Sequence, residues 1–88
     1  MDRAALIERR LRAALAPTSL EIADDSRLHA GHAGAQSGGG HFSVTIVSPR
    51  FRGQTTIGRH RMVYEALGEL MQKDIHALRI TALTPEES

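Results

Sequence analysis

Apolar residues recur at helical spacing along the first part of the chain. Between residues 2 and 16 they lie three or four positions apart, and arginine and glutamate residues fill the places between them. The apolar positions are Ala4, Ile7, Leu11, Ala14 and Leu15. This spacing predicts an amphipathic helix over 2–16. Asp2 suits its first position, and Pro17 ends it because proline lacks the backbone N–H that a further turn needs.

Three later segments alternate apolar and polar residues, which is the period of a half-buried strand. They are 19–24 (SLEIAD), 41–48 (HFSVTIVS) and 75–83 (IHALRITAL), and the middle one has the clearest alternation. In the last segment, His76 shares its side with the apolar residues at positions 78, 80 and 82. The pattern predicts that His76 faces the core, at the rim of the sheet.

A second helical stripe lies between the last two strands, in residues 56–73. Its members are His60, Val63, Tyr64, Leu67, Leu70 and Met71. Gly58 and Gly68 weaken this helix because glycine is a poor helix former, so the pattern leaves its ends open. A histidine on such a stripe is more often a buried, hydrogen-bonded residue than a ligand, and we expect this of His60.

The predicted order of elements is α-β-β-α-β, and the 88 residues suit a single domain with a polar tail at 84–88. The first two strands suit a hairpin, whereas the third follows a crossover helix and suits a parallel position. Right-handed crossover geometry then places both helices on one face of the sheet. We therefore expect an α+β fold with a three-stranded mixed sheet, and a content of 41% apolar residues supports a globular chain.

Composition removes several classes of function. The chain has no cysteine, so a soft metal or a cluster would need sulfur from a partner. No apolar run approaches the roughly 20 residues of a membrane span. The arginine-rich start contains Asp2 and Glu8, which favours a helix of the fold over a transit peptide, and a cytoplasmic location. The chain has no G-x-S-x-G motif and no evident pair of catalytic carboxylates, so we do not expect an enzyme.

Three of the five histidines lie in one glycine-rich stretch, HAGHAGAQSGGGH, between His29 and His41. The glycines lead into a strand, which disfavours a phosphate-binding loop because such loops precede a helix. His29 and His32 have H-x-x-H spacing, but two or three loop histidines without cysteine fall short of a stable zinc site. They are candidate metal ligands, and solvated loop histidines are the alternative. His76 is the other candidate ligand, and a rim histidine that covers apolar surface is the alternative.

Basic side chains are concentrated in the next part of the chain. Four arginines lie within twelve residues: Arg50, Arg52, Arg59 and Arg61. Such a group suits the phosphates of a nucleic acid or an acidic surface of a partner protein. The alternative is a solvated turn and helix start, and the net charge of +1 gives no strong field to attract a polyanion.

These segments together resemble the BolA family. The stretches LEIADDSRLHAGH, HFSVTIVSPRFRGQ, RHRMVYEAL and IHALRITALTPEE occur in the order and spacing of that family, and the resemblance runs from about Ile7 to Glu86. It implies the α-β-β-α-β fold, similar to the type II KH arrangement of RNA-binding proteins. The chain lacks the G-x-x-G loop with which KH domains hold RNA, so we do not expect RNA binding of that kind.

The resemblance also implies a partner and a cofactor. Members of the family pair with monothiol glutaredoxins and share one [2Fe-2S] cluster, to which glutaredoxin and glutathione each give a thiolate. The histidine matched by His76 is a ligand, together with a cysteine or histidine from the loop between the first two strands. Counting forward from the sequence DDS matches that residue to His29, whereas counting back from His41 matches it to His32. The loop is longer than in relatives, with Gly39 where they carry an acidic residue, and the unbroken strand end before it favours His29.

The resemblance leaves a different function open. Some bacterial relatives are DNA-binding transcriptional regulators that act in stress response and on cell shape. The arginines between positions 50 and 61 are the local support for that role, which requires them to be concentrated on one face. We expect the isolated chain to be a monomer or a weak homodimer that holds no cofactor of its own.

Overall fold

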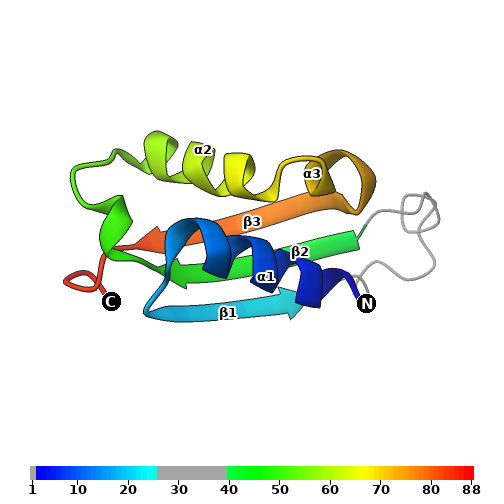
Figure 1. Ribbon diagram of the computed structural model, residues 1–88, viewed down its shortest axis with the longest axis horizontal. Helices are drawn as coiled ribbons and strands as arrows, with labels where there is room; N and C mark the ends of the chain where they lie inside the picture. The colour runs from blue at the N-terminus through cyan, green and yellow to red at the C-terminus, as the bar shows by residue number, and fades with distance from the viewer. Residues whose placement is uncertain (1, 26–39) are drawn as a thin grey trace.

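The computed structural model describes residues 2–25 and 40–88 (Figure 1). Its elements are α1 (Arg3–Leu15), β1 (Ser19–Asp24), β2 (Gly40–Val47), the 3-10 helix η3 (Pro49–Phe51), α2 (Thr56–Leu67), α3 (Leu70–Lys73) and β3 (Ile75–Leu83). The predicted α+β class is confirmed. Within the described ranges, no helix is long and apolar enough to cross a membrane.

The three strands form one mixed sheet in the order β1-β2-β3. β1 runs antiparallel to β2, and Leu20 lies opposite Ile46. β3 runs parallel to β2, and Ile80 lies opposite Val44. The helices lie on one face of this sheet, and no described element covers the other face (Figure 1). The predicted topology is therefore confirmed.

Apolar side chains fill the layer between the helices and the sheet. β2 contributes Phe42, Val44 and Ile46, each of which is at most 3% exposed. The other core members are Ile7, Leu11, Leu15, Phe51, Val63, Leu67, Leu70 and Ile75. Ser43 and Thr45 alternate with the core residues of β2 and face the uncovered side. The strand expected from the alternation of residues 41–48 is thus confirmed.

Local signals set the ends of the helices. The carboxylate of Asp2 accepts a hydrogen bond from the N–H of Ala5 at 2.8 Å and caps α1. The single helix predicted over 56–73 is wrong, because α2 ends at Leu67 and α3 begins at Leu70. Gly68 has a φ of 54°, and glycine adopts a positive φ without steric cost. This glycine therefore separates two helices rather than only weakening one.

Candidate functional site

The pairing of β2 and β3 contains a β-bulge at their first residues. Gly40 pairs with Ile75. His41 pairs with Ala77, which leaves His76 without an opposite residue. Such a bulge shifts the alternation of side chains by one position. Ile75 therefore packs in the core, whereas His76 and Ala77 are both exposed. The predicted core-facing orientation of His76 is wrong because alternation alone does not reveal a bulge, but its place at the rim is right.

The bulge brings the ring of His76 next to the ring of His41. The two ring centroids are 5.1 Å apart, and the ring planes are tilted by 46°. His41 is half-buried. Backbone hydrogen bonds fix the chain on both sides of the pair: the N–H of Asp25 donates to the carbonyl of His41 at 2.7 Å, and the N–H of Gly40 donates to the carbonyl of Asp74 at 3.0 Å. Two neighbouring strands thus hold two imidazoles together.

A hollow of about 470 Å³ adjoins His41 on the uncovered face of the sheet. Its lining residues are Asp25, His41, Phe42, Ser43, Ala77, Leu78 and Arg79. The carboxylate of Asp25 accepts a hydrogen bond from the hydroxyl of Ser43. The hollow therefore combines a carboxylate, a hydroxyl, an imidazole and a guanidinium group with the apolar residues Phe42, Ala77 and Leu78.

The other two candidate ligands are not placed. His29 and His32 lie outside the described residues, so their role remains a prediction. Among residues 2–25 and 40–88, no group of three or more histidine, aspartate or glutamate side chains is arranged to hold a metal ion. A metal ion bound at the rim therefore has at most two of these side chains as ligands, and water or a partner completes its coordination.

The expectation of a buried, hydrogen-bonded His60 is wrong. Its side chain is half-buried and lines a groove on α2 with Ile57 and Tyr64. Val63 and Leu67 are fully buried on the same helix, whereas Ile57 is 72% exposed and Tyr64 is 42% exposed. His60 lies between the buried residues and the exposed residues of α2. The apolar stripe of this helix is wider than the surface that packs against the rest of the protein.

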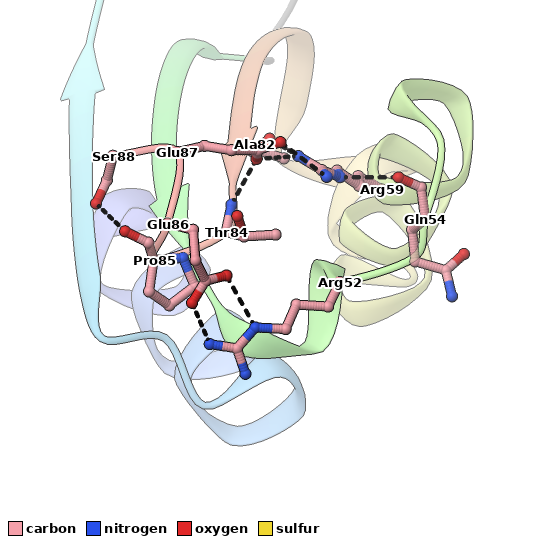
Figure 2. A network of polar contacts seen from close by, with 9 residues as sticks. All are labelled: Arg52, Gln54, Arg59, Ala82, Thr84, Pro85, Glu86, Glu87 and Ser88. Atoms are coloured by element: carbon pink, nitrogen blue, oxygen red, sulfur yellow. Dashed lines mark hydrogen bonds and ion pairs between the residues drawn. The ribbon is translucent and has the colours of Figure 1, made fainter.

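Arg59 is the centre of a polar network at the opposite end of the sheet (Figure 2). Its guanidinium donates to both carboxylate oxygens of Glu87, at 2.6 and 3.3 Å. It also donates to the backbone carbonyls of Gln54 and Ala82, each at 3.1 Å. The side chain of Arg59 is only 14% exposed. These contacts use four of the five N–H groups of this cation.

The other arginines of the predicted basic group have different surroundings. Arg52 pairs with the carboxylate of Glu86 through two hydrogen bonds (Figure 2). Arg50 donates to the backbone carbonyl of Ala14. Arg61 is exposed, and it has no hydrogen bond or ion pair to any residue that the structure describes. The four arginines thus do not form one free cationic surface.

The polar tail predicted from the sequence folds back and supplies the carboxylates of this network (Figure 2). Glu87 also accepts a hydrogen bond from the N–H of Thr84 at 2.8 Å. The hydrogen bond from Arg59, followed by that from Thr84, lowers the pKa of Glu87 to about 2. The hydrogen bond from Arg52 lowers the pKa of Glu86, and the same contact raises the pKa of Arg52. Both carboxylates are therefore held in their ionised form.

The similarity of this chain to known proteins agrees with its fold. A family model described as BolA-like protein matches residues 11–87. The chain belongs to the BolA family. The DNA-binding transcriptional regulator BolA of Escherichia coli (strain K12) is 43% identical over 81 residues, which cover 92% of this chain and 74% of that protein. The resemblance inferred from sequence motifs is confirmed.

Two Arabidopsis thaliana relatives extend the comparison within the BolA family. SufE-like protein 1, chloroplastic/mitochondrial, is 40% identical over 86 residues, which cover 92% of this chain but only 23% of that protein. The solved structure of BolA1 from Arabidopsis thaliana has a TM-score of 0.86 and 42% identity, and the match covers 100% of this chain and 97% of that one. A whole solved chain therefore shares this fold.

Sequence reasoning on this BolA-like chain missed the polar partners at both ends of the sheet. Asp25, which directly follows β1, contacts Ser43 of β2, and no spacing along the chain predicts that contact. Glu86 and Glu87 had a weak signal, since two adjacent acidic residues follow a group of arginines in the sequence. His41 closes the histidine-rich stretch of the sequence, but its position beside His76 depends on the bulge and could not be predicted.

Proposed function

We propose that this BolA-like protein is a partner of a monothiol glutaredoxin and shares with it a glutathione-ligated [2Fe-2S] cluster. Its role is in iron–sulfur cluster trafficking or in iron and redox regulation. The observation that carries this proposal is the exposed imidazole of His76, which lies at the rim of the sheet beside His41.

The donor chemistry of the chain supports this proposal. The cluster is cargo that two proteins hold between them. The chain has no cysteine, so the thiolates come from glutaredoxin and glutathione. Imidazole is a suitable ligand for iron, and in Rieske centres two histidines replace two thiolates on one iron. His76 supplies one imidazole, and His29 or His32 supplies the second, with His29 as the first choice.

The surroundings of the rim also suit a partner that carries glutathione. Glutathione has two carboxylates, an ammonium group and two peptide bonds. The hollow beside His41 offers the carboxylate of Asp25, the hydroxyl of Ser43 and the guanidinium of Arg79 to such groups. In the proposed complex, this polar lining contacts the tripeptide while His76 reaches the iron.

Anaerobic reconstitution of the chain with a monothiol glutaredoxin, glutathione, iron and sulfide tests this function. We expect a mixed complex that elutes as one species on a size-exclusion column. Its visible circular dichroism should differ from that of glutaredoxin alone, because imidazole ligands change the environment of the iron. A spectrum that is the same with and without this chain contradicts the proposal.

A second candidate is a DNA-binding transcriptional regulator of the BolA type, acting in stress response and cell morphology. The observation in its favour is the 43% identity of this chain to the DNA-binding transcriptional regulator BolA of Escherichia coli. Arg59 and Arg52 are occupied by carboxylates, so we expect weak binding that depends strongly on salt. A salt titration with promoter DNA and with random DNA decides the matter, since equal affinities contradict a specific regulator.

A further inference from the structure

The distance between the rings of His41 and His76 matches that of two imidazoles bound to one metal ion. Imidazole nitrogens bind a tetrahedral metal ion at about 2.0–2.1 Å, and two rings on one such ion have centroids roughly 5 Å apart. The observed separation is 5.1 Å. Rings that pack as an aromatic pair prefer offset parallel or perpendicular arrangements, and the 46° tilt is neither. Two imidazoles on one metal ion have no preferred angle between their planes, because each ring can rotate about its bond to the metal. The observed tilt is therefore compatible with a shared ion.

The two strands hold this pair in place without a ligand. The β-bulge sets His76 beside His41, and the parallel register of β2 and β3 continues from there. Hydrogen bonds of Asp25 with His41 and of Gly40 with Asp74 fix the backbone on either side. A site positioned on strands loses little conformational freedom when it binds a ligand. The pair is therefore organised in advance for an ion.

We propose that His41 and His76 form a two-imidazole chelate, which binds one borderline divalent transition-metal ion such as Zn²⁺ in the free protein. Imidazole suits zinc, copper and nickel, and the remaining positions of the ion are open to water or to donors of a partner. The inference shares His76 with the proposed function, but it needs neither glutaredoxin nor a cluster. An ion on the pair occupies His76 and therefore competes with the mixed complex.

Isothermal titration calorimetry of the full chain with Zn²⁺ alone tests the chelate. We expect the wild-type chain to bind one ion per molecule. His41→Ala and His76→Ala should each weaken binding by about tenfold or more, because a single imidazole loses the advantage of the second, tethered ligand. His60→Ala is the matched control, since it removes a half-buried histidine from α2 and should leave zinc binding unchanged.

His41 is half-buried, so its replacement can disturb the fold, and circular dichroism checks the fold of each variant. An NMR titration of the wild-type chain tests the chelate without any mutation. In the wild-type chain, Zn²⁺ should shift the ring NMR signals of both His41 and His76 and leave those of His60 in place. The inference is overturned by a wild-type chain that binds no zinc, by tight binding in folded His41→Ala, or by a shift of only one ring. Equal loss of binding in a His29→Ala, His32→Ala double variant also overturns it, because the strands alone would not hold the ion.

The two proposals fail in different ways. If His41→Ala abolishes zinc binding and no mixed complex forms with glutaredoxin, the chelate stands and the proposed function is wrong. If a mixed complex forms through His76 while His41→Ala leaves the affinity for zinc unchanged, the proposed function is supported and the chelate is wrong.

Discussion

At one end of the sheet, Arg59 holds Glu87 and two backbone carbonyls, whereas at the other end His41 and His76 meet ring to ring. The arginine is 14% exposed and uses nearly all of its donors within the chain (Figure 2). His76 is exposed. Both ends are rich in ionisable side chains, but those at the arginine end are paired with one another, whereas at the other end the exposed imidazole of His76 has, among the described residues, only the ring of His41 beside it.

This difference separates side chains that serve the fold from those that are available to a ligand. A phosphate reaches Arg59 only if hydrogen bonds to the fold are broken, and leaving a part-buried carbonyl without a donor costs free energy. A metal reaches the imidazole of His76 without such a loss. Residue type alone gave the arginines and the histidines equal standing as binding candidates, and the contacts within the chain distinguish them.

Among polar side chains, breaking the arginine end should have the largest effect on stability. Arg59→Met keeps the aliphatic stem of this 14% exposed side chain but removes the donor to the carbonyls of Gln54 and Ala82, so we expect a loss of about 2 kcal/mol in the free energy of unfolding. Urea denaturation measures this loss. Arg61→Met is the control on the same helix and should change stability by less than about 0.5 kcal/mol. Equal losses in the two variants would show that the network does not stabilise the fold.

The same end should give the protein an acid-sensitive contribution to stability. The pKa of Glu87 is about 2 in the folded chain and 4.5 ordinarily, so the unfolded chain binds the proton more readily. The contribution is present above the ordinary pKa and is lost as the pH falls from about 4.5 towards 2. Glu87→Gln should therefore show a flatter fall of unfolding free energy over that range than the wild type. Parallel curves for the two proteins would mean that Glu87 has no part in acid unfolding.

His60 should matter least to stability. It is half-buried and has no hydrogen bond to a residue of the described ranges, so we expect His60→Ala to change the free energy of unfolding by less than about 1 kcal/mol. Leu67→Ala, on the buried side of α2, should cost about 2–5 kcal/mol in the same thermal or urea experiment. A His60→Ala loss as large as that of Leu67→Ala would restore the expectation of a core histidine.

The sequence predicted those helices and strands well in which the spacing of apolar residues determines the secondary structure. The alternation around Val44 and the helical stripe through Leu11 led directly to β2 and α1. The prediction from sequence failed where the backbone conformation at a single residue ends a helix or shifts the register of a strand. Gly68 at positive φ divides one expected helix, and the bulge at His76 reverses the side on which that histidine lies.

The candidate site was predictable only in part, because side-chain contacts depend on tertiary structure. His76 was chosen from the resemblance to the BolA family, and its exposure at the rim supports that choice. Its neighbour His41 and the partnership of Arg59 with Glu87 arise from strand pairing and from the folded C-terminal segment. The sequence gives only a weak signal for the second contact, because two adjacent acidic residues follow the group of arginines.

The visible circular dichroism of a complex reconstituted with His76→Ala tests most directly whether His76 binds the shared cluster. We predict that the spectrum reverts to that of glutaredoxin and glutathione alone. The exposed position of His76 predicts that the melting temperature of the free variant changes little, and that His60→Ala keeps the mixed spectrum. A wild-type mixed spectrum from His76→Ala would contradict the assignment of this histidine as the ligand.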